Sequence, residues 1–342
     1  MSALRAVERQ ILSFLKNPYH GSMVPILSPM RGKEVKSEVW TITLKEKSQG
    51  NPLVLLHGFA SGSALWTLNL DQLACLDRPV IAVDLLGFGR SSRPKFSKEA
   101  EAVELEWVES LEAWRAALKV NSMVLIGHSL GGYLASSYAI RYPQHIEHLV
   151  LVDPWGFPAK PDNAITYSNL PLRARAIVKI LSSLNPLTLL RAAGPFGPSL
   201  VQKFRPDLVL KFSRFIDASL LFKYIYLCNS STPSGEIAFK VLLSEFGWAK
   251  RPMLPRLMAN LPLDMKVTFI YGASSWIKPD SGEAVRNQRP GHVKVHVIPD
   301  TSHHVYIDDP DAFIKCIADV CDVEIHLPKR LQFNPNEGKV PQ

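Results

Sequence analysis

The chain has 342 residues, of which 46% are hydrophobic and 20% are charged. This length and composition allow a large buried core, and they exclude a disordered chain, a collagen and a small disulfide-stapled scaffold. The formal net charge is +8, but residues 156–262 hold 14 Lys and Arg against 5 Asp and Glu, so one segment carries the whole imbalance.

The first residues, 1–16, place charged side chains beside aliphatic ones and predict a short amphipathic helix without a signal-peptide cleavage site. No apolar run reaches the roughly 18 residues that a membrane-spanning helix needs. The four cysteines form no C-x-x-C pair and lie in apolar surroundings, which predicts neither disulfides nor a zinc site. A cytoplasmic protein in a reducing compartment is expected.

Short aliphatic runs alternate with helical patterns along much of the chain. Helices are predicted over Glu101–Leu118, Tyr133–Tyr142 and Pro310–Cys321. This alternation predicts an α/β fold with a mostly parallel sheet flanked by helices. The predicted strands are Trp40–Leu44, Leu53–Leu56, Val80–Val83, Met123–Ile126, Leu149–Val152, Val267–Tyr271 and Val293–Ile298.

The alternation stops after Val152 and resumes near Val267, and the stretch between them is basic and rich in proline. Short helices are expected within it, over Arg173–Ser183 and Pro206–Phe222. An insertion of this kind predicts a helical cap after the sixth strand, over the C-terminal edge of the sheet. The expected organisation is an N-terminal amphipathic segment (1–35), a core (36–153 and 263–325), a basic helical cap (154–262) and a flexible tail (326–342).

A candidate nucleophile lies in residues 127–131, Gly-His-Ser-Leu-Gly, between a predicted buried strand and a predicted helix. This is the strand, turn and helix context of a nucleophile elbow, in which Ser129 would be exposed at the helix N-terminus. The flanking glycines permit a strained turn and close packing of strand against helix. An ordinary glycine-rich turn is the alternative interpretation.

A serine hydroxyl needs a base, and His303 is expected to supply it because it lies between the last predicted strand and the last helix. The neighbouring His304 is the competing candidate. Upstream, a predicted strand leads into His57, which is expected to orient the following loop. The backbone N–H groups of Phe59 and Leu130 are expected to form the oxyanion hole.

Two carboxylates could orient the base. Asp280 follows the strand Val267–Tyr271, later than is usual for such an acid, and is the favoured candidate. Asp153, at the end of Leu149–Val152, is the alternative, because the carboxyl ends of parallel strands converge on one site. Either residue could instead cap a helix or lie in a solvated turn.

Other chemistries find little support. No G-x-G-x-x-G or P-loop motif follows a strand, so dinucleotide and P-loop chemistry lack a phosphate cradle, and no cofactor or metal is expected. The basic segment has no recognition-helix or base-stacking pattern, so nucleic acid is not expected as a partner. A solvated helix face would explain the basic excess. So would an interface with anionic phospholipid, where each Lys or Arg near the surface contributes about 1 kcal/mol.

Several longer strings together resemble the α/β-hydrolase domain-containing 4/5 subfamily, over about residues 36–322. The strings are Asp84–Pro94, Asp153–Pro158, Ala193–Gly197, Thr232–Glu236 and Gly247–Leu254. The resemblance implies an α/β-hydrolase fold. Members of the subfamily are N-acylphospholipid and lysophospholipid lipases, and relatives that bind lipid droplets and co-activate a triacylglycerol lipase; lysophosphatidate acyltransferase activity is also ascribed to it. Co-activator members carry asparagine at the elbow, so Ser129 resembles the hydrolytic branch.

The chain departs from the subfamily at two places. The position of the subfamily's acid is occupied by Lys278, which leaves Asp280 to substitute for it or leaves the triad incomplete. The Trp-rich droplet-binding segment has no counterpart before Trp40, so membrane contact would depend on the amphipathic start and the cap. The subfamily's H-x-x-x-x-D acyltransferase motif is present from His303 to Asp308, and Asp308 is expected to cap the last helix.

The leading hypothesis is a serine acyl hydrolase of phospholipid or lysophospholipid esters, with Ser129 as nucleophile, His303 as base and Asp280 as acid. The alternatives are a lipid-droplet-associated co-activator of a partner triacylglycerol lipase and a lysophosphatidate acyltransferase. We expect the protein to be peripheral to the surface of a lipid droplet or the endoplasmic reticulum.

Overall fold

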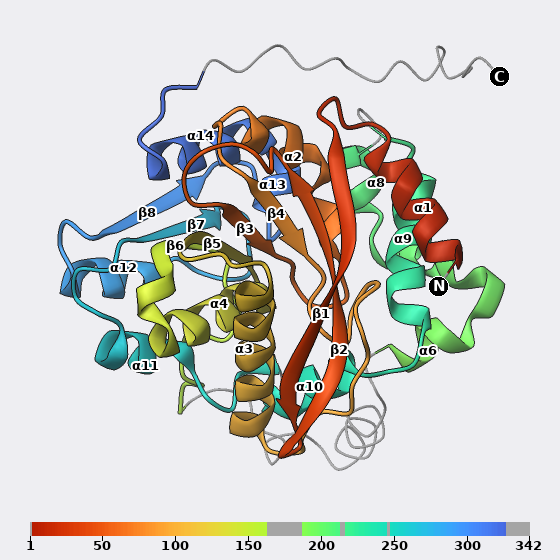
Figure 1. Ribbon diagram of the computed structural model, residues 1–342, viewed down its shortest axis with the longest axis horizontal. Helices are drawn as coiled ribbons and strands as arrows, with labels where there is room; N and C mark the ends of the chain where they lie inside the picture. The colour runs from red at the N-terminus through yellow and green to blue at the C-terminus, as the bar shows by residue number, and fades with distance from the viewer. Residues whose placement is uncertain (1, 163–186, 213–215, 245–246, 326–342) are drawn as a thin grey trace.

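Eight strands form one sheet in the computed structural model, which describes residues 2–162, 187–212, 216–244 and 247–325. Their order is β1-β2-β4-β3-β5-β6-β7-β8; β1 and β2 run antiparallel to their neighbours and the other pairs are parallel (Figure 1). The strands are β1 (Tyr19–Met30), β2 (Lys33–Leu44), β3 (Leu53–Leu56), β4 (Val80–Val83), β5 (Met123–His128), β6 (Ile146–Val152), β7 (Val267–Gly272) and β8 (Val293–Ile298).

The helices lie on both faces of this sheet and in the long connection between β6 and β7. The α-helices are α1 (Ser2–Leu12), α2 (Thr67–Ala74), α3 (Ala100–Ala117), α4 (Leu130–Arg141), α6 (Thr188–Ala192), α7 (Gly197–Phe204), α8 (Asp207–Phe212), α9 (Ala218–Ser230), α10 (Gly235–Leu242), α11 (Met253–Asn260), α12 (Asp280–Gln288), α13 (Val305–Asp308) and α14 (Pro310–Val320). Short 3₁₀ helices are η1 (Ser63–Trp66), η2 (Pro143–His145) and η4 (Gly194–Phe196).

The central strands are apolar on both faces because helices cover both. In β3, Leu53 and Leu55 pack into a core with α1, α2 and α14, whereas Val54 and Leu56 pack into a second core with α3 and α4. All four side chains are fully buried. This arrangement is typical of a parallel sheet between two helical layers, and it confirms the predicted fold class, including the helical insertion after the sixth strand.

One strand was not predicted. β1 pairs with β2 over its whole length and forms one edge of the sheet. It contains Pro25 and Pro29, which lack the N–H that a central strand would need but are tolerated at an edge. Its apolar side chains alternate, with Val24 and Ile26 buried against the core that contains α3. The N-terminal segment therefore holds both a helix and a strand.

The predicted N-terminal helix exists as α1, and its apolar side is buried within the protein. Leu4, Val7 and Ile11 belong to the core that also contains α9, against which α1 packs. The carboxylate of Glu8 is also buried; it accepts a hydrogen bond from the Trp40 indole at 2.9 Å and pairs with Arg90 at 2.6 Å. The apolar face of α1 is thus already occupied and is not a free membrane anchor in this fold.

The buried Glu8 carboxyl makes stability depend on pH. Burial, and to a lesser degree the Asp84 carboxylate, raise the pKa of Glu8 to about 7, against the lowering effect of Arg90. The pKa of Glu8 is higher in the folded protein than in the unfolded chain. The contribution of the protonated Glu8 carboxyl to the free energy of unfolding is therefore fully present below about pH 4.5 and is lost as the pH rises through 7. Between pH 5 and 8 we expect the wild type to lose ~1–3 kcal/mol more of its free energy of unfolding than Glu8→Gln, by urea denaturation. Parallel pH profiles for the two proteins would contradict this assignment.

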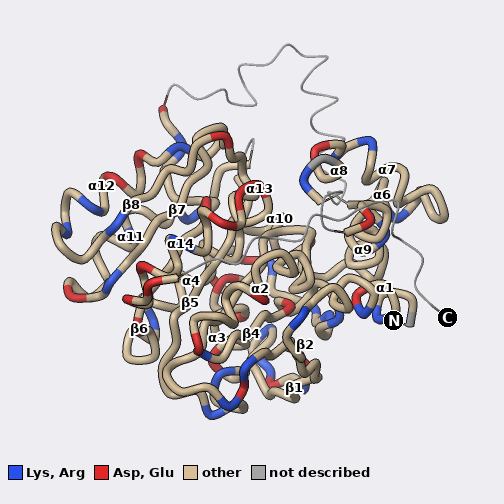
Figure 2. The backbone as a smooth tube through the Cα atoms, turned by 90° about the horizontal axis from the view of Figure 1, so that it is seen from above, with Lys and Arg blue, Asp and Glu red and all other residues tan. Residues whose placement is uncertain are grey.

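The cap region, helices α6 to α11, lies between β6 and β7 and carries Lys and Arg along its chain (Figure 2). Several of these cations are paired with carboxylates. Arg251 and Arg256 pair with Glu104 of α3, and Lys211 pairs with Asp308 at 2.6 Å. The predicted helix over 206–222 is divided between α8 and α9, while the one over 173–183 and the tail 326–342 lie outside the described residues. Among the described residues, no helix has both the length and the apolar composition needed to cross a bilayer.

Candidate active site

The G-x-S-x-G segment forms a sharp turn between β5 and α4. Ser129 adopts a left-handed backbone conformation with φ of 53°, which is strained for a residue with a side chain. The glycines allow close approach: a Cβ on Gly127 would lie 2.4 Å from the Gly131 carbonyl oxygen, and one on Gly131 would lie 2.5 Å from the Leu56 oxygen. The predicted strand, turn and helix are therefore present, and the serine lies at the N-terminus of α4.

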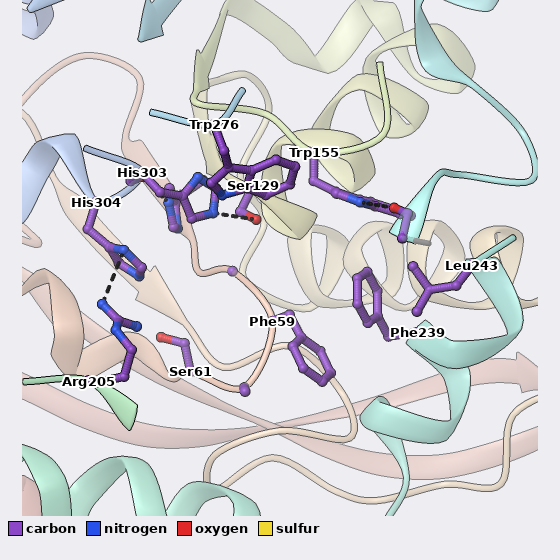
Figure 3. A pocket seen from close by; sticks show the side chains of 14 residues that line it. Phe59, Ser61, Ser129, Trp155, Arg205, Phe239, Leu243, Trp276, His303 and His304 are labelled. Carbon is purple, nitrogen blue, oxygen red and sulfur yellow. Dashed lines mark hydrogen bonds between the residues drawn. The ribbon is translucent and has the colours of Figure 1, made fainter. Parts of the chain in front are cut away.

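His303 lies in the loop after β8, with its ring beside Ser129 (Figure 3). Its Nε2 atom is 3.1 Å from the Ser129 hydroxyl, and its Nδ1 atom is 2.6 Å from Oδ2 of Asp153. A hydroxyl, an imidazole and a carboxylate in this row form the arrangement that activates a serine nucleophile.

Asp153, the less favoured of the two predicted acids, is the one that contacts His303. It follows β6, is fully buried, and has a φ of 44°. Its backbone N–H donates to Ile270 of β7 at 2.8 Å, and its carboxylate also accepts hydrogen bonds from the Ser275 hydroxyl and the Gly272 N–H. The end of β7 and the loop after it therefore hold this side chain in place.

The prediction that Asp280 is the acid is contradicted, because the carboxylate at Nδ1 of His303 belongs to Asp153. Asp280 is exposed, begins α12, and has no hydrogen bond to His303. Lys278, at the position of the subfamily's acid, is also exposed, and its ammonium donates to the Ser275 carbonyl at 3.3 Å. The carboxyl ends of β6 and β7 are adjacent, so Asp153, directly after β6, can contact His303 although Lys278, in the loop after β7, offers no carboxylate.

Two backbone N–H groups lie beside the serine without a hydrogen-bond acceptor in the described part of the chain. They belong to Phe59, in the loop after β3, and Leu130, the first residue of α4. His57 fixes this loop: its Nδ1–H donates to the Gly58 carbonyl at 2.7 Å, while Nε2 accepts from the Leu85 N–H at 3.0 Å. Both ring nitrogens are occupied and burial lowers the pKa of His57, so it orients the loop as a neutral imidazole.

His304, the competing base, has no hydrogen bond to Ser129. Its ring lies 5.2 Å from that of His303, and its Nδ1 atom is 3.5 Å from the Arg205 guanidinium. Burial, followed by the neighbouring His128 and Arg205, lowers the pKa of His304 well below its usual range. His304 therefore lines the site as a neutral imidazole.

The H-x-x-x-x-D motif does not bring Asp308 to the serine. Asp308 accepts hydrogen bonds from the backbone and hydroxyl of Ser302 and pairs with Lys211. The residue that caps the last helix is Asp309, whose side chain accepts from the Ala312 N–H at 2.9 Å. The expectation that Asp308 caps this helix is wrong by one position.

The serine and His303 open into a cavity of about 460 Å³ with largely apolar walls. Many of these walls come from the cap or the β6 connection and were not predicted from sequence. The unpredicted lining residues include Trp155, Arg205, Phe239, Leu243 and Trp276. These residues are far from Ser129 in the sequence, and the fold brings them to it. Trp155 had one sequence signal, since it belongs to the string Asp153–Pro158 that resembles the subfamily.

A second cavity of about 360 Å³ adjoins the first. The two share residues Phe59 to Ser61, in the loop after β3, together with Arg205 and His304. Its remaining walls come mainly from aliphatic side chains of α6, α7 and α9. A serine hydrogen-bonded to an imidazole and a carboxylate, with two N–H groups that meet no acceptor among the described residues, can perform acyl transfer on a lipophilic ester beside these apolar cavities.

Comparison with known proteins places this geometry in a family. A family model described as the alpha/beta hydrolase fold matches residues 51–310. The human (lyso)-N-acylphosphatidylethanolamine lipase is 44% identical over 324 residues, which cover 94% of this chain and 92% of the relative. The human 1-acylglycerol-3-phosphate O-acyltransferase ABHD5 is 48% identical over 288 residues, 84% of this chain and 82% of the relative.

Solved structures agree on the fold. An esterase from Thermogutta terrifontis superimposes with a TM-score of 0.62 at 23% identity, covering 88% of this chain and 98% of the esterase. The naproxen esterase of Bacillus subtilis gives a TM-score of 0.64 at 16% identity, covering 93% and 97%. Together with the sequence relatives, these matches confirm the resemblance: the chain belongs to the α/β-hydrolase family, in the group that contains the two human relatives named above.

Proposed function

We propose that this protein is a serine acyl hydrolase of phospholipid or lysophospholipid esters. The observation that carries the proposal is the hydrogen-bonded row from Ser129 through His303 to Asp153, at the wall of an apolar cavity. The N–H groups of Phe59 and Leu130, which have no acceptor within the described residues, would supply the donors that an oxyanion needs.

The proposed reaction follows from these positions. Ser129 Oγ attacks the acyl carbonyl while Nε2 of His303 removes its proton, and Asp153 holds the Nδ1–H tautomer and stabilises the imidazolium. The N–H groups of Phe59 and Leu130 receive the oxyanion. His303 then protonates the departing glycerol oxygen, and water repeats the sequence to release the fatty acid. A lysophospholipid hydroxyl in place of water would transfer the acyl group instead.

The proposed substrate class follows from the relatives and from the cavity. Their printed names refer to N-acylphosphatidylethanolamine and to 1-acylglycerol-3-phosphate, both of which carry an acyl ester next to a phosphate. Trp155, Phe239 and Leu243 line the catalytic cavity and offer apolar surface to an acyl chain.

We also propose that the protein works at the surface of a lipid droplet or the endoplasmic reticulum. The cap exposes large apolar side chains: Leu189 is 66%, Phe196 76% and Phe204 73% exposed. The last of these, with Leu189, also lines the second cavity. Apolar side chains at a cavity entrance would let a lipid pass from the interface into the site.

The test is hydrolysis by the purified wild type of a panel of phospholipid, lysophospholipid and neutral glycerol esters, with released fatty acid measured by mass spectrometry. Release from phosphate-bearing esters supports the proposal. Absence of release from every ester, with no acyl transfer to a lysophospholipid acceptor, would overturn it and leave the co-activator hypothesis. That alternative was suggested by Lys278, but Asp153 supplies the carboxylate contact that Lys278 cannot, which favours the enzyme.

A further inference from the structure

The catalytic cavity and the second cavity meet at one charged side chain. Arg205 is the one lysine or arginine among the described residues that line either cavity, and no aspartate or glutamate lines them. The other lining residues of the second cavity are mostly apolar: Phe59, Ala60, Leu65, Leu187, Leu189, Leu190, Leu200, Val201, Phe204 and Ile225. A cation among apolar walls favours an anionic ligand group, because the low-polarity surroundings strengthen the attraction.

The Arg205 guanidinium has one nitrogen left for a ligand. Its Nε and Nη2 atoms donate to the two carboxylate oxygens of Asp207 at 2.9 and 3.0 Å. Its Nη1 atom has no hydrogen-bond acceptor within the residues that the structure describes, and the side chain is 35% exposed. Nη1 carries two N–H groups that can donate charge-assisted hydrogen bonds to phosphate oxygens.

Arg205 also lines the catalytic cavity, on the side where His303 and His304 lie. Its Nη2 atom is 3.5 Å from His304, whose ring lies 5.2 Å from that of His303, and His303 is 3.1 Å from the Ser129 hydroxyl (Figure 3). In a glycerophospholipid the phosphate is separated from the acyl ester by only the few bonds of the glycerol unit. An ester at Ser129 can therefore place its phosphate near Arg205.

We propose that Arg205 is the phosphate-recognition residue of this site, binding the phosphate of a glycerophospholipid through Nη1 while the acyl ester lies at Ser129. The assignment rests on the proposed hydrolase function and adds the group that selects phosphate-bearing esters over neutral ones. Asp207 can yield part of its pairing, since it also pairs with Lys211 at 3.2 Å.

The test compares two water-soluble esters with the same short chain, 1-octanoylglycerol and 1-octanoylglycerol-3-phosphoethanolamine. A charge-assisted hydrogen bond contributes enough that Arg205→Ala is expected to lower the ratio of kcat/KM for the phosphoester to that for the neutral ester about ten- to hundredfold. Because the phosphate is remote from the reacting bond, the change is expected mainly in KM. An unchanged ratio would overturn the assignment.

Three further variants separate recognition from structure. Arg205→Lys keeps the charge but loses the planar guanidinium, so an intermediate ratio is expected. Asp207→Asn releases Nε and Nη2, so KM for the phosphoester is expected to fall; a rise equal to that of Arg205→Ala would show that the pair is merely structural and would overturn the proposal. Arg78→Ala removes a cation of a remote pair with Glu147, near the opposite ends of the parallel strands, and is the matched control without effect on the ratio.

A binding measurement distinguishes failure of this assignment from failure of the proposed hydrolase. Ser129→Ala is titrated calorimetrically with 1-octanoylglycerol-3-phosphoethanolamine, with and without Arg205→Ala. A loss of affinity of about tenfold or more in the double variant supports the assignment even if the wild type hydrolyses nothing. Equal affinities would overturn it even if the wild type is an active hydrolase.

Discussion

Ser129→Ala is expected to reduce ester hydrolysis by several orders of magnitude, about 10⁴- to 10⁶-fold in kcat, because the covalent route through the serine is lost. The same variant should not react with a fluorophosphonate probe, which forms a bond only to an activated serine. The hydroxyl is 3.1 Å from the base, and alanine fits the same turn without new contacts. Binding of substrate should change much less than kcat, since the cavity walls remain.

Labelling of the wild type and the variant, followed by peptide mapping, checks this expectation. Ser48→Ala, in the turn after β2, is a matched control that should label at the wild-type rate. Labelling of Ser129→Ala at another residue, or retention of its hydrolysis, would contradict the assignment of the nucleophile.

Asp153→Asn should be the second most damaging change, with a loss of about 10³- to 10⁴-fold in kcat. An amide at this position no longer fixes the Nδ1–H tautomer of His303 or stabilises the imidazolium. Asparagine has nearly the same shape and tolerates the φ of 44° better than most residues, so the fold should be preserved. The measurement is the rate of fluorophosphonate labelling together with kcat on a phospholipid ester.

Asp280→Asn provides the matched control for the acid. Asp280 is exposed at the start of α12, so its amide variant should label within about twofold of the wild type. A large loss in Asp280→Asn with none in Asp153→Asn would restore the interpretation that sequence favoured. Thermal unfolding of both variants shows whether any loss comes from the fold rather than from the chemistry.

The buried strands could be predicted because burial on both faces leaves continuous aliphatic runs. β3, β4 and β8 have the predicted bounds, and the remaining predicted strands were short by one to several residues. β1 could not be predicted in the same way, since Pro25 and Pro29 break a run that is only half buried. An edge position, which permits those prolines, is a property of the assembled sheet.

The sharp turn at Ser129 and the placement of His303 beside it could be predicted because each lies in a segment whose local sequence is diagnostic. The acid could not be assigned, because Asp153 and Asp280 each follow a strand and those strands, β6 and β7, are neighbours with adjacent carboxyl ends. Which aspartate points to His303 depends on the path of the loop after β7, where Ser275 turns inward to Asp153. Arg205 lies 76 residues beyond Ser129 in the chain, and only the folded cap brings it to the cavity.

During synthesis the ribosome makes α1 long before its partner helix α9. Roughly two hundred residues separate Leu12 from Ala218, and translation at about 5–20 residues per second takes ~10–40 s to produce them. Throughout that interval Leu4, Val7 and Ile11 lack the helix that covers them in the finished protein. The apolar side of this N-terminal segment therefore stays without its largest helical partner until the chain has been extended through α9.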